Sequence, residues 1–91
     1  MSRSTISITI PDPLAEQLPT DPDERARVVA LGLRGWRIER ALEAYRRGEG
    51  SLAFAARQAG ISLREIIPLA YAHGLTPRLD PAELEALDRQ S

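Results

Sequence analysis

Residues 51–74 contain the pattern that most constrains the fold, a short glycine-centred turn between two apolar segments. Ser51 has the side chain of a helix N-cap, directly after a Gly-Glu-Gly sequence. The i, i+3, i+4, i+7 spacing of a buried helix face is occupied by Leu52, Ala55, Ala56 and Ala59. Gly60 then supplies the positive φ that a tight turn needs. We therefore expect a first short helix that ends at Gly60.

A second helix should begin directly after this turn. Ser62 and Glu65 have the spacing of a capping box. The expected buried face consists of Leu63, Ile66, Ile67 and Ala70, and Gly74 should end the helix. The spacing from Ala56 through Gly60 to Ile66 is the one that helix-turn-helix motifs use. The sequence therefore predicts a helix-turn-helix over residues 51–75.

The outward face of the second helix limits how it can contact DNA. It carries Arg64, Glu65, Pro68, Leu69 and Ala72, of which only the first two offer much hydrogen-bonding capacity. Pro68 should kink or shorten the helix, because proline removes a backbone donor and clashes with the preceding turn.

DNA contact is therefore expected at the first turn of the second helix and just before it. The candidate DNA-binding residues are Arg57, Ser62 and Arg64, with Arg46 and Arg47 as phosphate anchors. The alternative is that these arginines only keep the surface soluble.

A long helix is predicted over residues 20–48. Thr20 or Asp21 can cap it, Pro22 suits its first position, and Gly48 should stop it after Arg47. Two apolar stripes run along it, one with Val28, Leu31, Ile38, Leu42 and Tyr45 and another with Val29, Leu33 and Trp36. Such a wide apolar face predicts contacts on two sides, one of them intermolecular. Gly32 and Gly35 would permit close helix crossing or a bend.

The first segment, residues 1–12, alternates apolar and polar side chains from position 4 to position 10. This pattern predicts a half-buried strand that the following prolines end. A lone strand needs a partner, so we expect pairing with the same strand of a second copy, in a homodimer. A ribbon-helix-helix variant would then place Arg3, Thr5, Ser7 and Thr9 in the major groove. The alternative is that this polar face is simply hydrated.

The last segment, residues 76–91, is acidic and has a short amphipathic pattern. Leu84 and Leu87 lie on one side of the helix that this pattern predicts. The segment is therefore expected either to fold on a partner protein through these leucines or to pack as a small helix on its own domain.

Composition restricts the function further. A chain of 91 residues with 4% aromatic residues forms one domain with a thin core. It has no cysteine and one histidine, so we expect no disulfide, metal site or cofactor. No paired carboxylates, phosphate-binding glycine loop or nucleophile–base spacing stands out, so we predict no catalytic residues and no enzyme activity. Without a long apolar run or a signal-peptide pattern, a cytoplasmic location without membrane association is expected.

Charge is distributed unevenly although the net charge is only -1. Residues 11–24 hold five acidic residues and no basic one, whereas residues 34–64 hold seven arginines against three glutamates. Residues 80–91 hold four acidic residues against Arg89. A basic centre suits phosphate contact and acidic ends suit a basic protein partner, although solvated helix faces would give the same pattern.

The segment from Ala41 to Gly74 resembles a family of small prokaryotic antitoxins, originally an uncharacterised protein family, and the Ile-Thr-Ile-Pro start resembles that family's N-terminal strand. The matching residues are Tyr45, Gly48, Ser51, Leu52, Ala55, Ala56, Ala59, Gly60 and Ser62. Gly50 and Pro68 depart from the family pattern, which has an apolar or β-branched residue and a helix former there.

The resemblance implies the antitoxin of a type II toxin–antitoxin pair. Such a protein would bind operator DNA as a dimer, repress its own operon and neutralise a PIN-domain ribonuclease toxin. The alternative that the residues leave open is a protein-interaction adaptor in which the helix-turn-helix is only a scaffold. The apolar outer face of Pro68, Leu69 and Ala72 favours this alternative.

Overall fold

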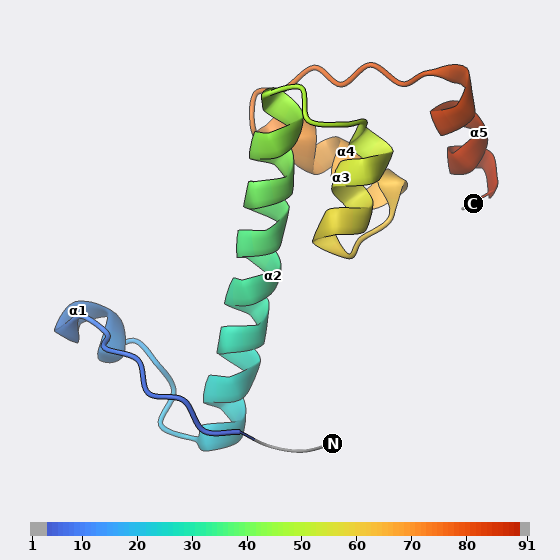
Figure 1. Cartoon of the computed structure of the whole chain (residues 1–91). Coiled ribbons are helices and arrows are strands. Elements are labelled where there is room, and N and C mark those ends of the chain that lie inside the picture. Colours follow the sequence, from blue (N-terminus) through green and yellow to red (C-terminus); the bar gives the residue numbers. More distant parts are fainter. Residues whose placement is uncertain (1–3, 90–91) are drawn as a thin grey trace. The chain divides into compact units, whose positions relative to one another are not determined.

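The computed structural model describes residues 4–89, apart from the side chains at positions 86 and 88, and its regular secondary structure is entirely helical. The helices, in chain order, are α1 (Asp12–Ala15), α2 (Pro22–Arg46), α3 (Leu52–Ala59), α4 (Leu63–Ala72) and α5 (Pro81–Arg89) (Figure 1). The mainly α prediction is confirmed. The chain divides within α2 into two units, Met1–Ala30 and Leu31–Ser91, which are described separately.

In the first unit, the strand predicted over residues 4–10 is not formed, because these residues have no regular secondary structure. The side chains of Ile6 and Ile8 are 83% and 66% exposed, so the face that the alternation predicted as half-buried is open. The physical reason is that an isolated strand leaves its backbone groups unpaired, and the described part of the chain supplies no second strand. Arg3 lies outside the described residues.

The start of α2 follows the predicted cap chemistry. Asp21 is the capping residue: its Oδ2 atom accepts a hydrogen bond from the amide of Glu24 at 3.0 Å, and its carbonyl accepts one from Arg25 at 2.9 Å. Pro22 occupies the first helical position, where its missing amide hydrogen costs nothing. Asp23 and Glu24 lie in the first turn, where the helix dipole favours acidic side chains.

The other end of α2 also matches the prediction. The helix ends at Arg46, and Gly48 takes a left-handed φ of +82°. The amide of Glu49 then donates to the carbonyl of Ala44 at 3.0 Å, which satisfies one of the last carbonyls of the helix. Between its ends the helix continues through Gly32 and Gly35, and a Cβ atom at either position would meet nothing within 4 Å.

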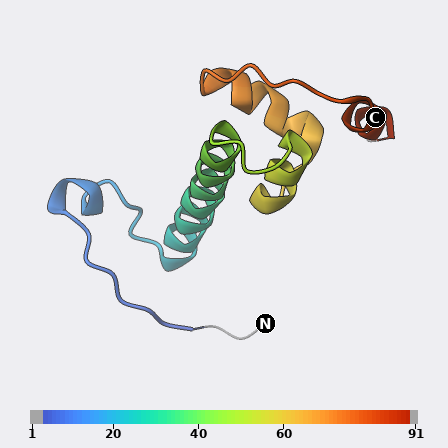
Figure 2. The same cartoon turned by 45° about the horizontal axis from the view of Figure 1, so that its top comes forward.

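The second unit contains the predicted helix-turn-helix. Ser51 caps α3 by accepting a hydrogen bond from the amide of Phe54 at 3.0 Å. Gly60 ends α3 with a φ of +74°, and Ser62 and Glu65 form both bonds of a capping box at the start of α4. These three local predictions are confirmed, and α3 and α4 lie beside the C-terminal end of α2 (Figure 2).

The core of the second unit lies between α2, α3 and α4. Its buried members are Ile38, Ala41, Leu42, Leu52, Ala55, Ala56, Ala59, Leu63, Ile66 and Ala70. Three alanines on α3 belong to this core, and their small side chains permit the close approach of neighbouring helices. The buried faces predicted for the two short helices are therefore confirmed, except that Ile67 is only half-buried.

Pro68 does not shorten α4, which continues to Ala72, so this part of the prediction is wrong. Pro68 is exposed, whereas Ile66 and Ala70 on either side of it are fully buried. Burial of these two side chains favours the helical path through the proline against its local cost. The last turn ends at His73 and Gly74, where Gly74 has a φ of +78°.

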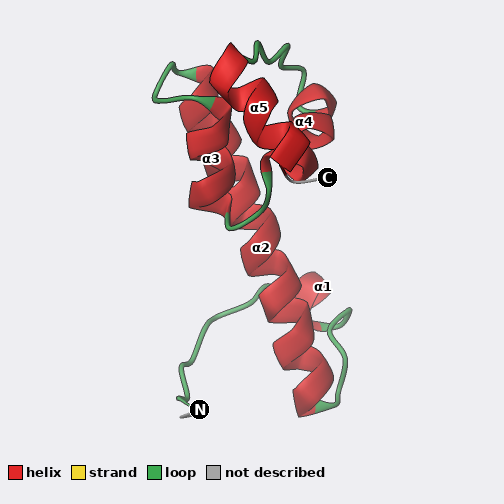
Figure 3. Ribbon diagram, turned by 90° about the vertical axis from the view of Figure 1, so that its right-hand side faces the viewer, coloured by secondary structure: helices red, strands yellow, loops and turns green. Residues whose placement is uncertain are grey.

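The C-terminal segment forms α5, which packs beside α4 (Figure 3). Asp80 caps this helix: its Oδ1 atom accepts from the amide of Glu83 at 2.8 Å, and the Glu83 carboxylate accepts from the amide of Asp80 at 3.2 Å. Of the two predicted partner-binding leucines, Leu87 packs against the core and Leu84 is 52% exposed. Of the two alternatives for this segment, the described structure has the small helix packed on its own unit.

Candidate nucleic-acid interface

Three of the predicted DNA-binding residues surround the turn between α3 and α4. Arg57 lies in the last turn of α3, where its carbonyl accepts a hydrogen bond from the amide of Gly60 at 3.2 Å. Ser62 and Arg64 lie at the opposite side of the same turn, at the start of α4. We name this set, Arg57, Ser62 and Arg64, the turn cluster. Because the turn is fixed by Gly60 and by a capping box, it holds the cluster in one local geometry.

The members of the turn cluster differ in how much hydrogen-bonding capacity remains. The Arg57 side chain is exposed and makes no hydrogen bond or ion pair with another described residue. The Ser62 hydroxyl accepts from the amide of Glu65 at 3.1 Å, and its hydrogen bond to the Glu65 carboxylate helps to lower the pKa of that residue. Nη2 of Arg64 donates to the carbonyl of Leu87 in α5 at 3.0 Å. The Arg57 side chain is thus open to a phosphate, whereas Ser62 is engaged by Glu65 and Arg64 by α5.

Glu65 places a negative charge beside the turn cluster, and its own contacts hold it ionised. Its pKa is lowered chiefly by the hydrogen bond from the Ser62 amide, then by the Ser62 hydroxyl, and further by the positive charge of Arg34. Arg34 on α2 contacts it at 3.2 Å in an exposed ion pair. The pair neutralises the carboxylate that would otherwise repel a phosphate near Ser62.

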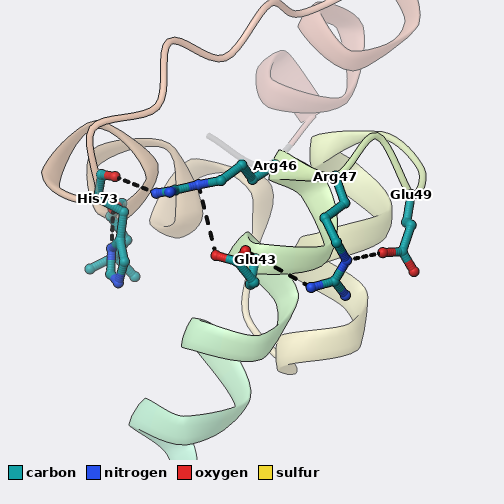
Figure 4. A network of polar contacts seen from close by, with 6 residues as sticks. Glu43, Arg46, Arg47, Glu49 and His73 are labelled. Carbon is teal, nitrogen blue, oxygen red and sulfur yellow. Dashed lines mark hydrogen bonds and ion pairs between the residues drawn. The ribbon is translucent and has the colours of Figure 1, made fainter.

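The two predicted phosphate anchors, Arg46 and Arg47, lie at the end of α2 in a polar network (Figure 4). Nη2 of Arg46 donates to the carbonyl of His73 at 3.1 Å, where a cation suits the C-terminal end of α4. The Glu43 carboxylate lies 3.8 Å from Arg46 and 3.9 Å from Arg47. Arg47 also pairs with Glu49.

The structure therefore divides the predicted DNA-binding set into two groups. Arg64 lies in the first turn of α4, whereas Arg46 contacts the carbonyl of His73 at the other end of that helix. His73 follows Arg64 by nine positions, which corresponds to about 14 Å along the helix axis. Only the turn cluster lies where a helix-turn-helix contacts base edges. Arg46 and Arg47 lie further from this turn, where they are suited to a phosphate of the DNA backbone and not to a base. Glu43 and Glu49 already offset their charge.

A second open feature is a groove between α2 and α3 with a volume of about 470 Å³. It is lined by Trp36, Arg37, Arg40, Ala41, Glu43, Ala44, Arg47, Glu49, Phe54 and Gln58. The guanidinium of Arg40 lies over the Trp36 ring, 4.7 Å from its centroid, which is within cation–π range. We name it the tryptophan groove. Sequence reasoning missed it because its two aromatic residues are 18 positions apart and no local pattern links them.

The remaining predicted residues lie apart from the turn cluster in the sequence and belong to other elements. Thr5, Ser7 and Thr9 are exposed in the irregular N-terminal segment of the first unit.

Glu83, which the sequence analysis did not name, is a buried acidic residue and accepts a hydrogen bond from the amide of Ala53 at 3.2 Å. The Asp80-x-x-Glu83 spacing is a capping signal, so the sequence did offer a way to find the start of this helix.

The described residues contain no group of three or more His, Asp or Glu side chains arranged to hold a metal ion. None of their helices combines the length and the apolar character that crossing a membrane requires. Comparison with protein families, curated proteins and solved structures finds no match to this chain.

Proposed function

We propose that this protein is the antitoxin of a type II toxin–antitoxin pair, a dimeric repressor that binds its own operator and neutralises a PIN-domain ribonuclease. The observation that carries the DNA-binding part is the turn cluster, in which the exposed Arg57 side chain lies at a capped turn between two short helices. The toxin part rests on the resemblance of the segment from Ala41 to Gly74 to small antitoxins.

Two surface features support the partner contacts of this proposal. Leu84 presents an exposed apolar side chain on the acidic helix α5, which suits capture by a basic, apolar groove. Leu31 and Trp36 on α2 are 61% and 50% exposed, and an unpartnered apolar helix face suits a second copy of the chain. The intermolecular strand ribbon also belongs to this proposal, because a second copy would supply the pairing partner that an isolated strand needs.

A gel shift tests the DNA-binding part directly. The full chain is titrated against duplex DNA from upstream of its own gene at several salt concentrations. Wild-type protein should bind more weakly as salt rises, and Arg57→Ala should lower the slope of log K against log salt by about one. Arg27→Ala, an exposed arginine near the start of α2, is the matched control for simple loss of charge. Absence of binding at low salt would remove the DNA-binding role.

The same assay separates the two ways of contacting DNA. If the helix-turn-helix reads the operator, Arg57→Ala and Arg64→Ala weaken binding, whereas Arg3→Ala and Thr5→Ala leave it unchanged. The opposite pattern would support the ribbon-helix-helix variant, in which the N-terminal segments enter the major groove.

The toxin part needs a separate measurement. The protein is expressed together with the product of the neighbouring gene, and growth and co-purification are recorded. Neutralisation of a ribonuclease would restore growth, and Leu84→Ala should weaken it. A neighbouring product that is harmless and does not co-purify would contradict this part.

A second candidate is the protein-interaction adaptor, and the tryptophan groove favours it. Trp36 and Phe54 are large exposed aromatic side chains at one open groove, which is the composition of a protein-binding surface. An adaptor would lose its partner on Trp36→Ala while showing no salt-dependent DNA binding. The antitoxin is preferred because the groove does not account for the turn cluster.

A further inference from the structure

Helix α5 contacts the helix-turn-helix at both of its ends. Near its N-terminus, Glu83 is 8% exposed, with one carboxylate oxygen bonded to the amide of Asp80 and the other to the amide of Ala53. Ala53 lies in the first turn of α3, where amide hydrogens have no acceptor within their own helix. One carboxylate therefore satisfies orphan donors of two helices, α3 and its own α5.

The other end of α5 contacts one member of the turn cluster. The carbonyl of Leu87 accepts a hydrogen bond from Arg64 at 3.0 Å, and Leu87 itself packs against the core. Carbonyls in the last turn of a helix carry partial negative charge, so they suit the same guanidinium that a phosphate would contact. A phosphate and the end of α5 thus offer competing acceptors to Arg64.

We propose that α5 is a built-in competitor of DNA, which holds the Arg64 guanidinium by a hydrogen bond in the free chain and releases it when a protein partner captures α5. This inference rests on the proposed function, because it assumes that the turn cluster binds DNA. The partner is expected to carry an apolar groove with a basic rim. Leu84 and Glu85 on the exposed side of α5 provide the first contact, and Leu87 joins them when the helix leaves its own unit.

The proposal has a thermodynamic consequence. DNA and the partner both favour the state in which α5 is released. Each therefore strengthens binding of the other by the same factor. The free chain should be the weakest DNA binder because Arg64 is held by α5.

The test compares three full-length variants that each remove one negative charge from the same segment. Glu83→Ala removes the bond to α3 and half of the α5 capping box, and Asp80→Ala removes the other half without touching α3. Both should tighten operator binding about three- to tenfold, the effect expected from losing a cap. Glu85→Ala changes an exposed residue that pairs with Arg89, so it controls for the change in charge.

Hydrogen exchange at the Ala53 amide reports docking of α5 without DNA. Exchange should accelerate in Asp80→Ala, which keeps the Glu83 acceptor of that amide, and stay slow in Glu85→Ala, so the difference reports release of α5. Circular dichroism checks that each variant keeps its helices, and Asp80→Ala gives the result if Glu83→Ala fails to fold.

The outcomes separate this proposal from the one it rests on. Tighter binding by Glu83→Ala and Asp80→Ala than by Glu85→Ala supports competition by α5. Equal operator binding by wild type and all three variants overturns it and leaves the DNA-binding function standing. No binding by any variant at low salt overturns both.

Discussion

Gly60 fixes the direction in which the chain enters the second helix of the motif. Its φ of +74° is a conformation that other L-residues adopt at a cost, and a Cβ atom there would meet nothing within 4 Å. The requirement for glycine is therefore one of backbone conformation alone, with no steric contribution from neighbouring side chains.

This separation gives a prediction with an internal control. Gly60→Ala should lower the free energy of unfolding by about 1–2 kcal/mol, because alanine is strained in the left-handed conformation. Gly35→Ala, in the middle of α2 and also with open space around it, should raise it by up to about 1 kcal/mol. Urea denaturation followed by circular dichroism measures both. A stabilising effect at Gly60 would contradict its assigned role.

Glu65 links the turn cluster to pH. Its pKa is lowered from the ordinary value of 4.5 by the Ser62 amide and hydroxyl and by Arg34. A carboxyl whose folded pKa lies below its unfolded pKa contributes stability above the unfolded value, and this contribution is lost as pH falls through the folded value. The difference in unfolding free energy between wild type and Glu65→Gln should therefore be present at pH 7 and disappear on acidification below about 4.5. A difference that persists unchanged to pH 2 would contradict this assignment.

At the residue scale, local rules predicted the turn well because its determinants are close in sequence. Ser62 and Glu65 are three residues apart, so their mutual bonds follow from spacing alone. Arg34 and Glu65 are 31 positions apart, and their ion pair depends on how α2 packs against α4. No periodicity in the sequence encodes such a contact, so the partner of Glu65 was not predicted.

At the element scale, α5 shows how an amphipathic pattern can satisfy two different surfaces. Leu84 and Leu87 were expected to act together, yet Leu87 packs on the core and Leu84 is exposed. The sequence pattern gives the period of the helix and does not specify what each side meets. The two leucines should therefore respond differently to substitution.

The expected difference is between stability and partner binding. Leu87→Ala should lower the unfolding free energy by about 1–2 kcal/mol, because it removes partly buried apolar area. Leu84→Ala should change it by less than about 0.5 kcal/mol, as expected for a surface position, while weakening neutralisation of the partner. Thermal unfolding and a growth-rescue assay measure the two effects. Equal destabilisation by both substitutions would contradict the observed packing of α5.

The N-terminal segment has the sequence pattern of a strand but does not form one. Alternation from position 4 to position 10 satisfies the pattern of a strand, but a strand also requires a partner edge. Ile6 and Ile8 are exposed because the described chain supplies no strand edge with which the segment could pair. Whether the segment becomes a strand is decided by a second chain and therefore lies beyond any local rule.

At the scale of the whole molecule, the core of the second unit uses only part of α2. Ile38, Ala41 and Leu42 are its buried residues, whereas Leu31, on the same stripe two turns earlier, is exposed. The sequence predicted the apolar stripe, but it did not predict the point along α2 beyond which α3 and α4 no longer cover that stripe. That boundary is set by the length of α3 and α4, which pack against the C-terminal end of α2.

A homodimer through this uncovered part of α2 is the last prediction. Burial of a leucine side chain contributes about 1.5–3 kcal/mol, so Leu31→Ser should raise the dimer dissociation constant about tenfold or more. Glu39→Ser, at an exposed polar position of the same helix, should leave it unchanged. Sedimentation velocity across a concentration series measures both, and circular dichroism of the monomer checks that α2 persists. A chain that is monomeric at all concentrations, or a dimer indifferent to Leu31→Ser, would place the contact elsewhere. In a symmetric dimer each partner presents one turn cluster, so Leu31→Ser, which disrupts the dimer, should also weaken operator binding.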